Sequence, residues 1–144
     1  MVKQAGEGSE SSTRALRAEA LRAFIARAFV AVGMPDTDAA TVAALMTEAD
    51  LQGSDGHGVI RLAPYLKRIR AGGINLHPEI RVVEERAATA LIDGDNAMGH
   101  LVMTRAAQIA AEKAQRAGIG WAGTRFSNQP ARRRSTREWR CRAT

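Results

Sequence analysis

The spacing of apolar residues differs between the two halves of this 144-residue chain, and the difference limits the folds open to it. Up to residue 73 the apolar positions recur every three or four residues, which is typical of amphipathic helices. Beyond residue 73, short extended runs flank one further helical run. A helical region followed by a small sheet predicts an α+β fold.

Three helices are expected in the first half. The second runs from Asp36 to near Gly53, and the third is a shorter helix within residues 59–70, where Pro64 limits how far upstream it extends. The first covers residues 13–32, and its pattern is typical of an amphipathic helix: Leu16, Ala20, Phe24 and Ala28 recur every four residues, with Leu21, Ile25 and Phe29 beside them.

The second half predicts three extended segments and one helix. Strands are expected within residues 74–86, 89–92 and 119–126. The cluster Asp93-Gly94-Asp95-Asn96 is expected to end the second strand in a tight turn rather than to form a phosphate or metal loop. A helix is expected over Gly99–Ala117, because Val102, Ala106, Ile109, Ala110 and Lys113 share one face and Gly118 is a natural C-terminal cap.

Both ends of the chain are expected to lie outside the packed fold. Residues 1–12 are rich in Gly, Ser and Glu and are expected to be disordered. Residues 129–144 have no periodicity and no aliphatic residue larger than alanine, so they cannot bury enough surface to offset their ordering entropy. Residues 13–73 then form a helical region, residues 74–128 form an incomplete α/β unit, and the remainder is an arginine-rich tail.

The net charge of +6 belongs mostly to that tail. Residues 130–144 hold six arginines and one acid, Glu138, whereas residues 1–129 hold 15 basic and 14 acidic groups. Nucleic-acid binding by the tail is an alternative function, but a non-functional tail is favoured because Trp139 is its only aromatic residue.

The remaining composition favours a cytoplasmic protein. No apolar run approaches the ~20 residues that span a bilayer, and the N-terminus has no apolar stretch typical of a secretory signal. The single cysteine, Cys141, cannot form an internal disulfide. Cys141, His77 and His100 are isolated without metal-ligand spacing, so no metal site is expected.

The segment from Gly53 to Tyr65 carries the strongest sign of a functional site. His57 stands between two glycines, and Arg61 and Tyr65 follow at intervals of four residues. Histidine exchanges a proton near neutral pH, and arginine matches a carboxylate with two parallel hydrogen bonds. These residues predict a site for a small acid whose neighbouring oxygen gains or loses a proton. The alternatives are a turn histidine, a solvated arginine and a tyrosine that packs in the core.

These residues resemble the malate/L-lactate dehydrogenase family, a group of nicotinamide oxidoreductases that do not use a Rossmann fold. The resemblance covers residues 15–128 in order and spacing. The matching segments are Asp50-Leu51-Gln52-Gly53, Gly56-His57-Gly58-Val59-Ile60-Arg61, Tyr65, Arg70-Ala71-Gly72, Ile74-Asn75, Ala88-Thr89-Ala90-Leu91-Ile92-Asp93-Gly94-Asp95-Asn96, Glu112-Lys113-Ala114 and Ser127-Asn128.

The resemblance implies both an architecture and an activity. Residues 13–73 would be a substrate-side helical region, and residues 74–128 would begin a largely antiparallel cofactor-binding sheet domain. Members of the family interconvert 2-hydroxy and 2-oxo acids, or related imino acids and ureidoglycolate, with NAD or NADP, and they commonly form homodimers. Most cofactor contacts would lie beyond Asn128, so no cofactor-binding residue is assigned.

The family's site residues carry over only in part. His57 would hydrogen-bond the carboxylate or the reacting oxygen of the substrate, Arg61 would pair with the carboxylate, and Tyr65 would line the pocket. Gly56 replaces a serine of the family motif. The family's principal acid/base is a histidine directly after Ser-Asn, where this chain has Gln129, and an amide cannot exchange the proton that accompanies hydride transfer.

We therefore expect a truncated and inactive member of this oxidoreductase family. A shifted reading frame in a GC-rich gene explains the arginine-rich tail, and the DNA downstream of the codon for Asn128 tests this hypothesis. If no single-base change restores a family-like continuation, the hypothesis is wrong. The alternative is a non-catalytic interaction module that pairs with an intact paralogue.

Overall fold

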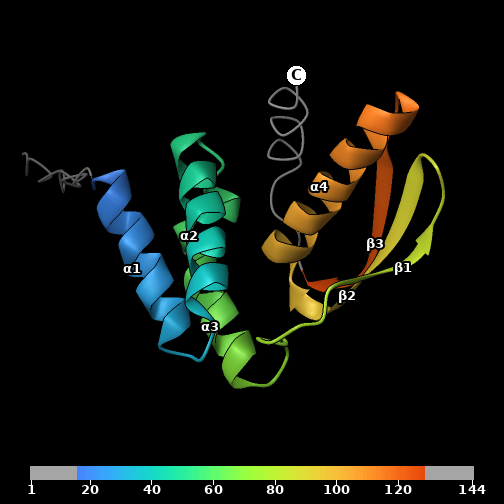
Figure 1. The fold of residues 1–144 in the computed structure, drawn as a ribbon. Coiled ribbons are helices and arrows are strands. Elements are labelled where there is room, and N and C mark those ends of the chain that lie inside the picture. The colour runs from blue at the N-terminus through green and yellow to red at the C-terminus, as the bar shows by residue number, and fades with distance from the viewer. Residues whose placement is uncertain (1–15, 129–144) are drawn as a thin grey trace, which may run out of the picture.

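The structure, a computed structural model, describes residues 16–128 of the chain (Figure 1). The expectations for residues 1–12 and for the arginine-rich tail lie outside the described residues, and so does Gln129. The described chain has a helical half and a sheet half, joined end to end (Figure 1). The predicted α+β class is confirmed.

The helical half contains three α-helices, as predicted. They are α1 (Ala18–Val30), α2 (Asp36–Leu51) and α3 (Leu62–Arg70). Two single turns of 3-10 helix, η1 (Asp55–His57) and η2 (Val59–Arg61), connect α2 to α3. Pro64 lies in the first turn of α3, where a backbone N–H would have no partner within the helix.

Only part of the predicted apolar side of α1 is buried. Leu16, which precedes the helix, and Phe24 are 71% and 52% exposed, whereas Ile25 and Phe29 are fully buried. Successive residues of a helix are rotated by about 100°, so only one of two neighbouring stripes can face α2. Contact with α2 selects the stripe through Ile25 and Phe29, and the periodicity of α1 alone could not distinguish the two.

The sheet half is a three-stranded mixed sheet with α4 (Gly99–Ala117) packed against it (Figure 1). The strands are β1 (Arg81–Glu85), β2 (Thr89–Met98) and β3 (Trp121–Asn128), in the order β1-β2-β3. β1 pairs with β2 antiparallel, and β2 pairs with β3 parallel, with α4 as the crossover between them. The helix has the predicted bounds, and Gly118 caps it with a φ of 76°.

The predicted turn at Asp93-Gly94-Asp95-Asn96 is wrong. β2 continues through this cluster to Met98, and its register against β3 shifts between Asp93 and Ala97. Asp95 and Asn96 have φ values of 47° and 57°, a left-handed conformation that Asp and Asn tolerate better than most residues. The cluster therefore makes an irregularity within a long strand instead of ending the strand.

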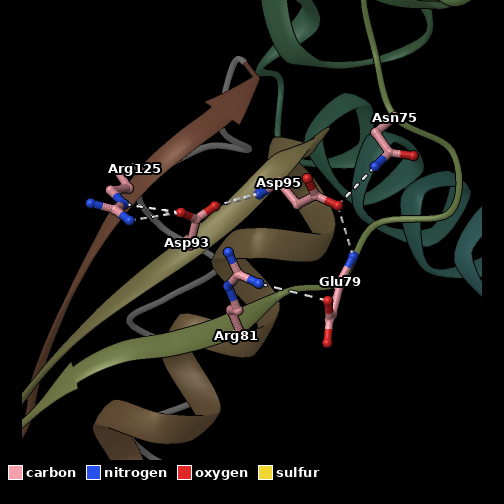
Figure 2. Close-up of polar contacts among 6 residues, drawn as sticks. All are labelled: Asn75, Glu79, Arg81, Asp93, Asp95 and Arg125. Carbon is pink, nitrogen blue, oxygen red and sulfur yellow. Dashed lines mark hydrogen bonds and ion pairs between the residues drawn. The ribbon is translucent and has the colours of Figure 1, made fainter.

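The two aspartates of this irregularity hold neighbouring segments together (Figure 2). Asp95 Oδ2 accepts hydrogen bonds from Asn75 Nδ2 at 2.8 Å and from the backbone nitrogen of Glu79 at 3.0 Å. Asp93 accepts the backbone N–H of Asp95 and the Nε–H of Arg125, each at 3.0 Å, and these bonds lower the pKa of its carboxyl group. Both carboxylates therefore stabilise the fold through these hydrogen bonds.

Two apolar clusters form the core of the described chain. Ala90, Ile92, Ala106 and Ile109 make the smaller cluster, between the sheet and α4. The larger cluster fills the helical half and includes Met98, the last residue of β2. The end of β2 and the beginning of α4 therefore lie where the two halves meet.

Candidate functional site

The turns between α2 and α3 are held by a carboxylate from α2. Asp50 Oδ2 accepts the backbone N–H of Val59 at 2.8 Å. A Cβ atom on Gly58 would overlap the Asp50 carboxylate, so this position requires glycine. The contact fixes the backbone between His57 and Arg61, and thus the positions from which both side chains project.

Arg61 lies across the same loop. Its Nε donates a hydrogen bond to the backbone oxygen of Gly56 at 2.8 Å. This bond uses one edge of the guanidinium group and orients the rest of its plane. The predicted pairing of His57 and Arg61 in one loop therefore has a physical basis, since both are held by contacts within residues 50–61.

Tyr65 is buried and lies one helical turn beyond Arg61 on α3. It is 6% exposed, and burial raises the pKa of its phenol, although the charges of Arg61 and Arg68 oppose that rise. The phenol is consequently protonated at neutral pH. Tyr65 belongs to the main apolar cluster, so the core-packing interpretation of this residue is correct for its ring.

His100, which the sequence analysis treated as isolated, lies against Tyr65. The two ring centroids are 5.8 Å apart with an interplanar angle of 85°, an edge-to-face contact. His100 is 2% exposed, and its Nδ1 has no hydrogen-bond partner among residues 16–128. Burial, together with the charge of nearby His57, lowers the pKa of His100 to about 4, so its imidazole is neutral at pH 7.

No signal in the local sequence could have placed His100 here. It is the second residue of α4, and 43 positions separate it from His57. Only the packing of the sheet half on the helical half brings it to the loop. The structure therefore places Tyr65 in contact with a residue that sequence reasoning missed, while the charge of His57 acts on His100 and that of Arg61 acts on Tyr65.

Within residues 16–128, no three His, Cys, Asp or Glu side chains gather closely enough to hold a metal ion. In the same part of the chain, no helix has the length and apolarity needed to cross a membrane.

The fold is a helical unit joined to a mixed sheet, and Tyr65 of the helical unit meets His100 of the sheet unit. A family model described as malate/L-lactate dehydrogenase matches residues 16–135. The chain belongs to the malate/L-lactate dehydrogenase family, as its motifs predicted. The matched range continues past Asn128, where the motif resemblance ended.

Curated relatives and solved structures agree with this family. Malate dehydrogenase of Pyrococcus abyssi is 44% identical over 108 residues, which are 75% of this chain and 30% of the relative. The structure of malate dehydrogenase from Pyrococcus horikoshii superposes with a TM-score of 0.80 and 41% identity, covering 89% of this chain and 36% of that one. Sulfolactate dehydrogenase from Methanocaldococcus jannaschii gives a TM-score of 0.83 and 34% identity, covering 85% and 36%. The chain thus spans about a third of the length of these relatives.

The family implies a nicotinamide cofactor, and the described residues do not provide a complete cradle for one. A cavity of about 360 Å³ lies between α4 and residues 118–122, but alanines, glycines, Met103, Ile119 and Trp121 line it. This lining has no cation for the pyrophosphate of a dinucleotide.

Proposed function

We propose that His57, Arg61 and Tyr65 form the substrate wall of an oxidoreductase that interconverts 2-hydroxy and 2-oxo acids with NAD or NADP. The observation that carries this proposal is the contact of Tyr65 with a buried neutral histidine of the sheet half, on which the charge of His57 also acts. The names of the relatives support it, since malate and sulfolactate are both 2-hydroxy acids.

Each residue has a role that its contacts support. The Nε of Arg61 is engaged by Gly56, and its terminal nitrogens can donate two hydrogen bonds to a carboxylate. His57 can donate a hydrogen bond to the reacting oxygen or to the carboxylate. Tyr65 keeps its phenolic proton at neutral pH and can donate it to the same anion.

The 144-residue chain alone is proposed to be inactive. Reduction of a 2-oxo acid requires a proton at the oxygen that becomes the hydroxyl, and Gln129 replaces the family's acid/base histidine. Removing such a group costs roughly 10²- to 10⁴-fold in rate. Turnover of NADH or NADPH by the purified chain with pyruvate or oxaloacetate would contradict this proposal.

We also propose separate roles for the two halves of the chain. Residues 13–73 would act as the substrate-side region and residues 74–128 as the beginning of the cofactor domain. A family-like homodimer in the cytoplasm, with either NAD or NADP, is the proposed setting. The reading-frame shift after Asn128 is the proposed origin of the tail.

Binding of a 2-oxo acid tests the substrate wall directly. Calorimetric titration of the full chain with oxaloacetate should detect binding, and Arg61→Gln should weaken it at least tenfold because a charge-assisted pair is lost. Arg70→Gln is the matched control, since Arg70 is an exposed arginine at the end of α3, the helix that follows Arg61. Equal affinities for all three proteins would exclude Arg61 from the site.

One observation favours a second function, that of a non-catalytic interaction module. Phe24 on α1 is 52% exposed, and Leu16, which lies just before the start of α1, is 71% exposed. An apolar surface of this kind suits docking to an intact family member. Co-purification with such a paralogue, lost in Phe24→Ser, would support this function, whereas retention of the complex in that variant would contradict it.

A further inference from the structure

Two buried side-chain polar atoms lack a hydrogen-bond partner within the described residues, Nδ1 of His100 and Oγ of Ser127. They belong to neighbouring parts of the fold, because Ser127 is in register with Ala97 and His100 lies three residues beyond Ala97. Folded proteins pair nearly all of their buried polar groups, and an exception calls for a reason. Two buried polar atoms therefore lack hydrogen bonds within the described residues, in the region where β2 and β3 end and α4 begins.

Stability does not explain the imidazole of His100. The residue is 2% exposed and packs edge-on against Tyr65, and a phenylalanine could fill the same space without a polar edge. Phenylalanine would also remove the cost of burying an unpaired nitrogen. A residue that fits less favourably than an apolar alternative points to a functional requirement at that position.

We propose that His100 is a positioning residue of the acid-binding site, through which the sheet half orients Tyr65 and His57. This inference rests on the proposed function. His100 lies on α4 and Tyr65 on α3, and their rings meet edge to face, so one side chain joins the sheet half to the site residue on α3. His100 lies in the first turn of α4, a helix of 19 residues, so its position is more rigid than the loop between α2 and α3.

The neutral state of His100 suits this role. A cation at this buried position would compete with Arg61 for the carboxylate of the substrate. Because burial keeps the imidazole neutral at pH 7, the carboxylate is directed to Arg61. His100 contributes shape and one directed polar group instead of charge.

Substitution of His100 in the full chain separates positioning from packing. His100→Phe should fold with an unchanged or higher melting temperature yet bind oxaloacetate about five- to tenfold more weakly, the loss expected for one oriented polar contact. His100→Asn returns an amide near the place of Nδ1 and should recover part of the affinity while lowering the melting temperature. If His100 acted only through packing, His100→Phe would bind oxaloacetate more tightly than His100→Asn, and this result would contradict the inference.

Ile109→Val is the matched control on the same helix, because Ile109 is buried in the other apolar cluster. It should lower the melting temperature and leave the affinity unchanged. If His100→Phe does not fold, His100→Leu is measured in its place. Wild-type affinity in the apolar variant overturns this inference alone, whereas a wild-type chain that binds no 2-oxo acid overturns the proposed function together with it.

Discussion

Asn128 at the end of β3 donates hydrogen bonds from its side-chain nitrogen to both the backbone oxygen and the Oδ1 of Asn96, each at 2.7 Å. The same nitrogen lies 3.2 Å from the backbone oxygen of Ala97. These contacts hold the left-handed conformation of Asn96, where β2 departs from regular pairing. The last described residue of β3 thus secures the irregularity in its neighbour.

Replacement of Asn128 should destabilise the chain. Asn128→Leu keeps the approximate volume but removes the hydrogen bonds that the side-chain amide donates to Asn96 and Ala97, so we expect a loss of about 1–3 kcal/mol in the free energy of unfolding. Urea denaturation measures this loss. The control is Gln115→Leu, because Gln115 is an exposed amide on α4 and its replacement should change stability by about 0.5 kcal/mol or less. Equal effects of the two substitutions would contradict this account.

Alanine substitution should lower the stability of the chain at one of the two glycines beside His57 and not at the other. Gly58→Ala places a methyl group onto the Asp50 carboxylate, so it should cost about 1–3 kcal/mol of stability and weaken acid binding by shifting His57 and Arg61. Gly56→Ala meets no atom within 4 Å and should be tolerated. Thermal unfolding and oxaloacetate titration of both variants provide the comparison. Tolerance of Gly58→Ala would show that Asp50 does not constrain the loop.

Lys113 should contribute more to stability than its ionic partner. Its buried ammonium group donates to Glu85 Oε1 at 2.9 Å and to the backbone oxygen of Arg86 at 2.6 Å. Lys113→Met keeps the aliphatic stem and removes both bonds, so we expect a loss of about 1–3 kcal/mol by denaturant unfolding. Glu85→Gln should have a smaller effect because the Glu85 side chain is largely exposed. A larger loss for Glu85→Gln would mean that the ion pair dominates.

The stability of the chain should fall as the pH decreases from about 6.5 to about 4. His100 has a pKa of about 4 in the folded chain and an ordinary value of 6.5, so in this range the unfolded chain binds a proton that the folded chain does not. Above pH 6.5 His100 is neutral in both states and does not reduce the free energy of unfolding. Below pH 6.5 the protonation of His100 in the unfolded chain lowers that free energy progressively, by on the order of 3 kcal/mol. Unfolding curves of the wild type and of His100→Phe at several pH values isolate this effect, and parallel pH profiles would refute it.

Local signals predicted the helices well. α4 has the predicted bounds because its apolar residues keep one period throughout and Gly118 supplies a left-handed C-terminal cap. The strand predicted at residues 89–92 lies within β2, but its predicted end was wrong because Asp93-Gly94-Asp95-Asn96 has the composition of a turn. Partners distant in sequence, Asn75, Arg125 and Asn128, satisfy that cluster within a strand, and propensity takes no account of them.

The candidate site divides in the same way. His57, Arg61 and Tyr65 stand four residues apart and are held by contacts within one short segment, so their grouping was visible in the sequence. His100 joins them only through the packing of α4, and its lowered pKa is a consequence of that burial.

By itself the sequence determined the family, the α+β class and the loop that carries His57 and Arg61, because spacing and glycine placement act over a few residues. Tertiary structure alone decided which face of α1 is buried, how β2 continues through its irregularity, and that His100 lies beside Tyr65. Each of these depends on contacts between segments far apart in the chain, and the free energy of such contacts is absent from any local pattern.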